Sequence, residues 1–211
     1  MDVTKVIEKL EKEYYGMGCG LEFSSPFELL ISTMLSAQTT DVSVNKATKI
    51  MYKVYNTPKQ FASLSPEEVE PYIRTLGLYK NKAKNMVNAS KIIVEEFNSN
   101  VPSTMEGLTS LPGVGRKTAN VVLANAFGHD AIAVDTHVFR VSNRIGLTDG
   151  KNVDEVEKQL MSVLPQNTWS NMHHYIIWHG RKVCSARNPK CNICVLKDEC
   201  RFNLEGITKE G

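Results

Sequence analysis

Hydrophobic residues recur at every third and fourth position along most of this sequence, which is the period of a helix with one buried face. The N-terminal stretch MDVTKVIEKLEKEYYG shows the pattern with apolar Val3, Val6, Ile7, Leu10 and Tyr14. The same reasoning predicts helices over residues 26–38, 41–55, 65–77, 79–97, 104–110, 115–127, 136–146, 153–163 and 168–183. Strand-like alternation is scarce and no repeat is present, so the sequence predicts an all-α fold.

Two loops, at residues 16–25 and 128–134, are the best places to divide the chain. We expect a central domain of six helices over residues 21–130. We expect residues 1–20 to pack with residues 131–211 as a second, discontinuous helical domain. The central domain would then be an insertion between the two parts of the terminal domain.

The stretch SLPGVGRKTANVVLANAF, residues 110–127, places a Gly-Val-Gly turn between two predicted helices. A Walker phosphate loop would need glycines where Arg116 and Leu111 stand, and a dinucleotide fingerprint would need one at Thr118 and a preceding strand. The pattern is that of a helix–hairpin–helix, whose turn can meet a DNA phosphate without reading base sequence. The candidate phosphate contacts are Gly113, Val114, Gly115 and Arg116. An ordinary corner between two helices is the alternative.

The composition is that of a soluble globular protein, with 42% hydrophobic and 23% charged residues and a formal net charge of only +2. Nucleic-acid affinity would therefore have to come from local patches, and two segments lack acidic residues. They are residues 79–91, with Lys80, Lys82, Lys84 and Lys91, and residues 180–191, with Arg181, Lys182, Arg187 and Lys190. Solvated lysine faces are the alternative for each patch.

The N-terminus is an amphipathic helix and not a signal peptide, and Asn125, His129 and Asp130 interrupt the longest apolar stretch. We therefore expect no membrane segment, a cytoplasmic location and a reducing environment. Disulfides would then be an improbable use for the five cysteines.

Four cysteines near the C-terminus, spaced C-x6-C-x2-C-x5-C, indicate a metal centre. Zinc sites usually present two short cysteine pairs, and only one short pair is present here. Wide loops suit an iron–sulfur cluster better, because it accepts thiolates at separated corners. Zinc is the alternative. The predicted ligands are Cys184, Cys191, Cys194 and Cys200, whereas Cys19 is expected to be a free thiol.

Together these features resemble the endonuclease III family of helix–hairpin–helix DNA glycosylases, which carries a 4Fe–4S cluster. The matching stretches are LSAQTTD, GLYKNKA, LPGVGRKTA, VDTHVFRV, HHYIIWHGR and the cysteine spacing, over about residues 35–200. The resemblance implies two helical domains with a DNA-binding cleft between them. It also implies excision of oxidised or saturated pyrimidines, followed by strand cleavage at the abasic sugar.

Residue by residue, the resemblance places the nucleophilic lysine at Lys117 and the catalytic aspartate at Asp135. It places the side chain that fills the gap left by the everted base at Gln38, and an apolar wedge at Leu78. The four cluster ligands fall on the cysteines named above. We expect a monomer that acts on double-stranded DNA containing damaged bases or abasic sites, near the nucleoid.

The chemistry fits these residues, but each has a simpler interpretation. A lysine amine attacks a sugar carbon only when neutral, and a helix N-terminus, a neighbouring Arg116 and burial would all oppose the ammonium form of Lys117. A protonated Lys117 bound to a phosphate is the alternative. Asp135 can cap the helix that follows it, and Gln38 and Leu78 can be surface helix ends.

Two other functions stay open from the sequence alone. One is a glycosylase of the same superfamily that acts on mismatches and lacks lyase activity, and the residue at position 117 discriminates it. The other is a helix–hairpin–helix DNA-binding module without catalysis, for which VDTHV and Gln38 would have no purpose.

Overall fold

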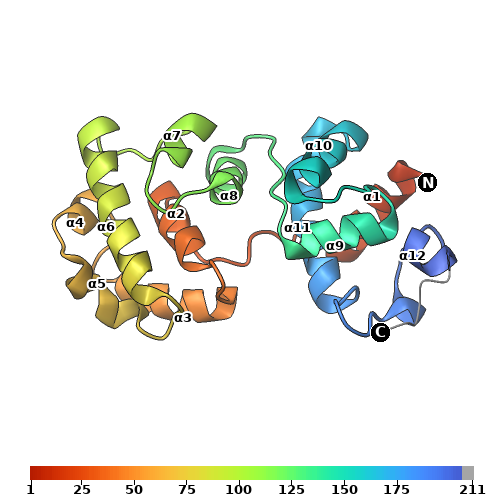
Figure 1. The fold of residues 1–211 in the computed structure, drawn as a ribbon, viewed down its shortest axis with the longest axis horizontal. Coiled ribbons are helices and arrows are strands. Elements are labelled where there is room, and N and C mark those ends of the chain that lie inside the picture. Colours follow the sequence, from red (N-terminus) through yellow and green to blue (C-terminus); the bar gives the residue numbers. More distant parts are fainter. Residues whose placement is uncertain (206–211) are drawn as a thin grey trace. The chain divides into compact units, whose positions relative to one another are not determined.

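The structure is a computed structural model, and it describes residues 1–205. These residues form helices and loops without a strand, so the predicted all-α class is confirmed. The helices are α1 (Val3–Tyr14), α2 (Pro26–Leu35), α3 (Asp41–Met51), α4 (Pro58–Ala62), α5 (Pro66–Ile73), α6 (Tyr79–Glu96), α7 (Met105–Thr109), α8 (Arg116–Phe127), α9 (Thr136–Ile145), α10 (Val153–Val163), α11 (Trp169–Lys182) and α12 (Arg201–Leu204), with short 3₁₀ turns at Gln166–Thr168 and Cys191–Ile193 (Figure 1).

The chain forms two compact units, each with its own hydrophobic core. The central unit is Cys19–His129 and contains α2 to α8. The terminal unit joins Met1–Gly18 to the residues from Asp130 onward and contains α1 and α9 to α12. The division into a domain of residues 21–130 and a domain of residues 1–20 and 131–211 stays a prediction. No helix within residues 1–205 is both long and apolar enough to cross a bilayer.

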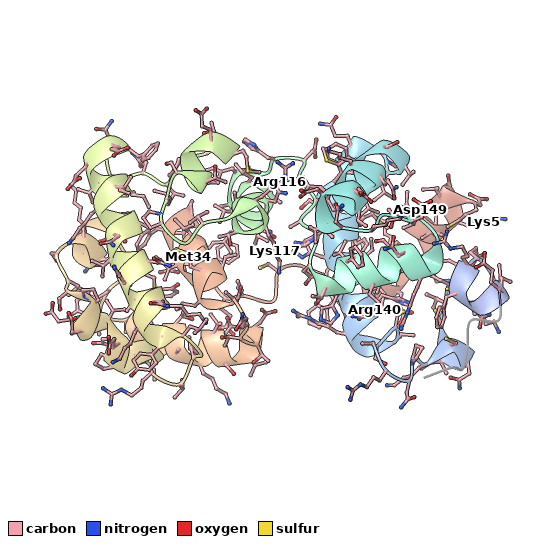
Figure 2. All side chains as sticks on the ribbon, in the orientation of Figure 1. Lys5, Met34, Arg116, Lys117, Arg140 and Asp149 are labelled. Atoms are coloured by element: carbon pink, nitrogen blue, oxygen red, sulfur yellow. The ribbon has the colours of Figure 1, made fainter. Side chains whose placement is uncertain are left out.

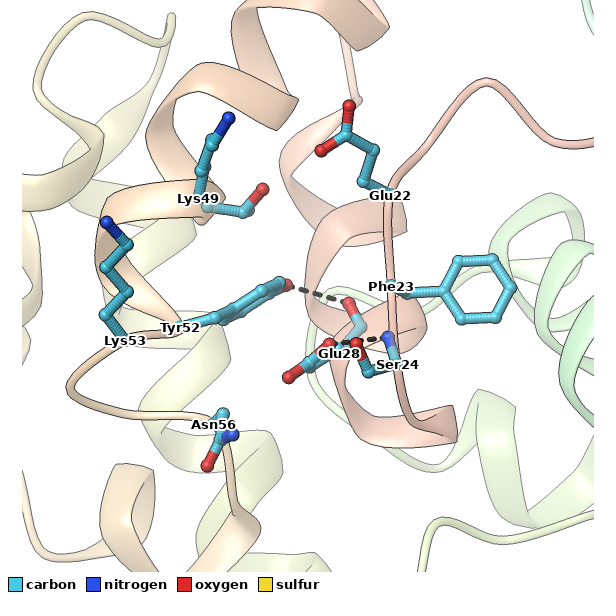
Figure 3. Close-up of a pocket in the computed structure, with 9 residues that line it drawn as sticks. Glu22, Phe23, Ser24, Glu28, Lys49, Tyr52, Lys53 and Asn56 are labelled. Carbon is cyan, nitrogen blue, oxygen red and sulfur yellow. Dashed lines mark hydrogen bonds between the residues drawn. The ribbon is translucent and has the colours of Figure 1, made fainter.

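In the central unit α2 is the most deeply placed helix, because nine of its ten residues are buried. It begins where the Ser25 side chain accepts the backbone N–H of Glu28, with Pro26 in the first turn. Tyr52, after α3, donates its hydroxyl to the Glu28 carbonyl at 2.8 Å, and the Glu28 carboxylate accepts the Ser24 N–H (Figure 3). These bonds fix the start of α2 against the end of α3.

The short helix α4 is absent from the sequence-based prediction. Thr57 caps it, the Gln60 side chain reciprocates, and Pro58 occupies its first turn. This capping box was readable as Thr-Pro-x-Gln, but the helix is only five residues long and shows no period. α4 and α5 both pack against α6, and α2 packs against α8.

The terminal unit is built around α11, which packs against α9 and α1. The apolar face predicted for the N-terminal helix is correct, since Val6, Leu10 and Tyr14 are at most 1% exposed. α9 begins at an aspartate cap and ends at Gly146, whose φ of +96° lies in the left-handed region. These packing contacts set α9 beside the start of the cysteine loop.

Candidate active site and metal centre

The Gly-Val-Gly turn is a tight turn followed directly by α8. The Val114 N–H donates to the Leu111 carbonyl at 3.1 Å, with Pro112 and Gly113 at the two central positions. Gly113 has a φ of +77°, as the third residue of a type II turn requires. Val114 is buried and anchors the turn, whereas Gly113 and Gly115 are exposed. The geometry therefore presents backbone at the surface, as the sequence predicted.

The N-terminus of α8 can receive an anion. Its cap residue is Gly115, which has no side chain to bond the N–H groups of this helix end. The first turn of a helix carries unpaired N–H groups and the positive end of the dipole, so it attracts a phosphate.

Arg116 and Lys117 form the first two positions of α8, and both side chains are exposed (Figure 2). The burial that the sequence interpretation of Lys117 invoked is absent from the protein without DNA, whereas the helix N-terminus and the adjacent Arg116 are present as expected.

Gln38 lies in the loop between α2 and α3 and is exposed. Its φ is +55°, so a residue other than glycine is held in the left-handed region. Leu78 has a φ of +58°, is 59% exposed and stands at the N-cap of α6. An exposed leucine at a strained position is available to enter a base stack, which agrees with its predicted role.

Lys82 corrects one part of the sequence analysis. It was grouped with the basic patch of residues 79–91, yet it is only 6% exposed. Its Nζ donates to the carbonyls of Leu35 and Ala37 at 2.8 and 2.9 Å and to Thr39 Oγ1 at 2.9 Å. Desolvation by burial lowers the pKa of Lys82. This lysine binds the protein's own loop, and is not placed to bind a phosphate.

In the terminal unit, Asp135 is the N-cap of α9. Its Oδ1 accepts the backbone N–H groups of His137 and Val138, both at 2.8 Å. Both bonds use one oxygen, so the cap does not occupy Oδ2. The side chain is half-buried, and the cap holds the carboxylate in a fixed orientation. The capping role is therefore real, and it is compatible with a chemical role for the second oxygen.

The four C-terminal cysteines line one small pocket together with apolar residues, among them Ile145, Leu196 and Phe202. The pocket holds about 310 Å³ of space not filled by atoms. None of these four cysteines forms a disulfide, and neither does Cys19, which is half-buried in the central unit. Burial raises the pKa of the Cys194 thiol to about 11 in the absence of a metal, so a bound metal would have to displace that proton.

Four cysteines line this pocket, and an iron–sulfur cluster takes one thiolate at each of four separated corners. Four soft sulfur donors around an apolar pocket are therefore a suitable ligand set for iron and sulfide.

The sequence analysis missed two arginines on α9 that hold the start of the cysteine loop. Arg140 donates to the carbonyls of Gly180 and Cys184, at 3.1 and 3.0 Å. Arg144 donates to the Ser185 and Ala186 carbonyls, at 2.7 and 3.0 Å. The available signal was two arginines four residues apart on one predicted helix, which share a face.

The loop held in this way presents the predicted DNA contacts Arg187 and Lys190. Both side chains are exposed. The Lys190 N–H donates to the Val183 carbonyl at 3.0 Å, and the Ser185 hydroxyl donates to the Arg187 carbonyl at 2.6 Å. Two positive charges are therefore displayed on a backbone that is itself well hydrogen-bonded.

One histidine reaches the cysteines. His179 is 1% exposed, its Nδ1 lies 3.0 Å from the Tyr14 hydroxyl and its Nε2 lies 3.4 Å from Cys194 Sγ. Burial lowers the pKa of His179 to about 4, so the ring is neutral at pH 7. A thiolate can only accept, so with a ligated Cys194 the ring donates from Nε2 and accepts the Tyr14 hydroxyl at Nδ1.

Comparison with known proteins points to the same family as the sequence motifs. Residues 31–166 match the model of the HhH-GPD superfamily base excision DNA repair proteins, and residues 184–200 match the iron-sulfur binding domain of endonuclease III. The chain is 53% identical to endonuclease III of Escherichia coli K12 over 86% of each chain. It is 45% identical to that of Haemophilus influenzae over 96% of this chain and 97% of the relative.

Solved structures agree. A trapped endonuclease III–DNA covalent intermediate, in an estranged-adenine complex, is 44% identical and superposes with a TM-score of 0.91 over 97% of both chains. A non-covalent endonuclease III–DNA complex gives a TM-score of 0.92 at 44% identity, over 98% of this chain and 97% of the other. The iron-sulfur match excludes the zinc alternative, and the enzyme matches exclude a non-catalytic module. The chain therefore belongs to the endonuclease III family, and it is a base-excision-repair DNA glycosylase that carries an iron–sulfur cluster.

Proposed function

We propose that this enzyme removes oxidised or saturated pyrimidines from double-stranded DNA and then cleaves the strand at the abasic sugar, with Lys117 as nucleophile and Asp135 as the assisting carboxylate. The observation that carries the proposal is an exposed lysine in the first turn of α8, directly behind the Gly113–Gly115 turn. A relative that is 44% identical has been trapped covalently on DNA, which supports a covalent step here.

The chemistry follows from the position of Lys117. Its neutral amine attacks C1′ of the damaged nucleotide, the Nζ–C1′ bond forms, and the base leaves with the electron pair of the glycosidic bond. The sugar ring opens to a Schiff base. This imine makes a C2′ proton acidic, and loss of that proton expels the 3′ phosphate by β-elimination.

The surroundings of Lys117 support this role. Lys117 lies at a helix N-terminus beside Arg116, and bound DNA would add the burial that the free protein lacks. The turn amides and Arg116 would hold a backbone phosphate, which fixes the sugar near the amine without reading the sequence.

Asp135 would act through its second carboxylate oxygen. Oδ1 is occupied by the cap of α9, so Oδ2 is the atom that takes a proton from the amine or balances positive charge on the sugar as the base departs. His137 is a weaker candidate for a base, because burial lowers its pKa and its Nδ1 lies 3.1 Å from Arg140.

The iron–sulfur cluster would be held by Cys184, Cys191, Cys194 and Cys200, and no step of this reaction needs electron transfer. Its proposed role is structural: it fixes the loop that carries Arg187 and Lys190 against the DNA backbone. Gln38 would pair with the orphaned base and Leu78 would hold the stack open. We also propose that the protein acts as a monomer.

Borohydride trapping tests the proposal, because it reduces an imine between lysine and sugar to a stable adduct. The wild-type protein should be trapped on a thymine-glycol duplex, and Lys117→Gln should bind the same duplex without adduct or strand cleavage. Asp135→Asn keeps an acceptor for the cap, so it should fold normally but release the base about 10²–10⁴ times more slowly.

The outcomes separate the alternatives. A wild-type protein that releases the base without an adduct would be a glycosylase without lyase activity, and the proposal would be wrong. An adduct on Lys117→Gln would identify another amine as the nucleophile. An Asp135→Asn variant with full activity per folded molecule would leave this aspartate with its capping role alone.

A further inference from the structure

Lys82 is the most unusual polar group of the central unit. It lies in the first turn of α6 and is only 6% exposed, yet no acidic side chain is among its three hydrogen-bond partners. Those partners are two backbone carbonyls and one hydroxyl, all from residues 35–39, which form the loop that carries Gln38.

The contacts fit an ammonium group. Three N–H bonds of a protonated lysine meet three acceptors at 2.8–2.9 Å, while the Thr39 hydroxyl has its own acceptor in the Ala37 carbonyl at 3.3 Å. The Leu35 carbonyl belongs to the last turn of α2, where the negative end of the helix dipole favours a cation. A neutral amine could donate to only two of these groups, and the Thr39 hydroxyl would have to leave the Ala37 carbonyl and donate to the amine instead.

Lys82 also connects this loop to the wedge residue. Its backbone N–H donates to the Leu78 carbonyl at 3.0 Å, while its side chain holds both neighbours of Gln38 in sequence, Ala37 and Thr39. Gln38 and Leu78 both have left-handed φ values, of +55° and +58°. The side chain of Lys82 therefore restrains the loop that carries Gln38, and it ties this loop to the first turn of α6, where Leu78 is the N-cap.

We propose that Lys82 is a positioning residue for base eversion, which holds the Gln38 loop and Leu78 as one preformed surface that enters the DNA stack together. The inference rests on the proposed roles of Gln38 and Leu78 and adds the group that organises them. Without the side-chain restraint, the Gln38 loop would relax toward ordinary backbone conformations and lose its fixed place beside the start of α6, and the observed rate would fall with the fraction that remains competent.

The test compares two DNA substrates, of which only the first requires a base to leave the stack. The first is a duplex with thymine glycol opposite adenine, in which the damaged base must leave the stack and the gap opposite the adenine must be filled. The second carries an abasic site in a single-nucleotide bulge, which has no opposite base. Lys82→Met removes the ammonium at similar length, and Lys59→Met makes the same charge change at an exposed position of α4 in the same unit.

Lys82→Met should lower single-turnover base release from the duplex roughly 10–100-fold, while cleavage of the bulged abasic site stays within about threefold of wild type. Lys59→Met should match wild type on both substrates. 2-Aminopurine opposite the lesion reports insertion directly, and its fluorescence change should be slower in Lys82→Met at equal binding. Circular dichroism and the absorbance of the cluster would establish that both variants are folded.

Equal losses on both substrates, or no loss on the duplex, would overturn the proposal. A second check uses Gln38→Ala alone and combined with Lys82→Met: if the lysine acts through the glutamine, the two losses are far from additive. Additive losses would mean that Lys82 acts elsewhere. A wild-type protein that forms no borohydride adduct would instead refute the lyase function, so the two failures are distinguishable.

Discussion

Substituting Gly113 by alanine perturbs the hairpin at the position where its geometry is most restrictive. The φ of +77° is left-handed, and a Cβ built there would lie 2.7 Å from Nδ2 and 2.9 Å from Cβ of Asn85 on α6. Gly115, two residues later, provides the matched control. It has a φ of −94°, and a Cβ there would meet no other atom within 4 Å.

The expected cost combines two effects. A left-handed alanine costs about 1–2 kcal/mol, and forcing Asn85 away costs about 1–3 kcal/mol more. Gly113→Ala should therefore destabilise the central unit by about 2–5 kcal/mol, or lower its melting temperature by roughly 4–20 °C. Gly115→Ala should cost about 1 kcal/mol or less, since alanine is only a poorer N-cap than glycine.

Thermal unfolding of the three proteins measures the difference, and Asn85→Gly completes a double-mutant cycle. In the double variant, Asn85→Gly should relieve the clash with Ala at position 113 and restore about 1–3 kcal/mol of the lost free energy of unfolding. The cost of the left-handed backbone should remain. Affinity for a duplex with an abasic-site analogue should fall at least about tenfold in Gly113→Ala, because the turn amides move. Equal destabilisation by the two alanines, or no coupling to Asn85, would refute this reasoning.

Three further predictions concern the terminal unit. Arg187→Glu and Lys190→Glu should weaken binding to damaged and undamaged duplexes alike and reduce the salt dependence measured by fluorescence anisotropy; a loss confined to damaged DNA would make them lesion readers. Arg144→Met should lower iron per chain and the absorbance near 400 nm by loosening the cysteine loop, and unchanged iron content would contradict this. Burial lowers the pKa of His174 to about 4 in the folded protein, whereas a histidine in the unfolded chain has a pKa of about 6.5. The unfolded state therefore binds the proton first, and the free energy of unfolding falls as the pH drops below about 6.5. By pH 5.5 the loss is about 1.4 kcal/mol, and His174→Gln should show a shallower decline in melting temperature between pH 7.5 and 5.5.

The sequence predicted the long helices and the hairpin because their signals are local. Caps, glycines and helical period fix α8, α9 and α10 within a residue or two, and Asp135 was identifiable as a cap for the same reason. Lys82 was assigned to the surface because its partners lie more than forty residues away, and no local pattern indicates that a lysine is buried. The contacts of Arg144 with the cysteine loop are long-range in the same way.

The place of α1 in the terminal unit has a consequence for the order in which the chain folds during synthesis. α1 is made before the central unit, but its buried residues pack against α11, which is made only after residues 19–129. The central unit can therefore complete its own core before α11 has been synthesised, while the apolar face of α1 is still unpacked. Closing so long a loop costs little more than closing a shorter one, but it delays the contact. Tyr14 would meet His179 late, shortly before the last of the four cysteines is synthesised. Assembly of the metal centre would then follow the folding of the central unit, although α1 is made before that unit.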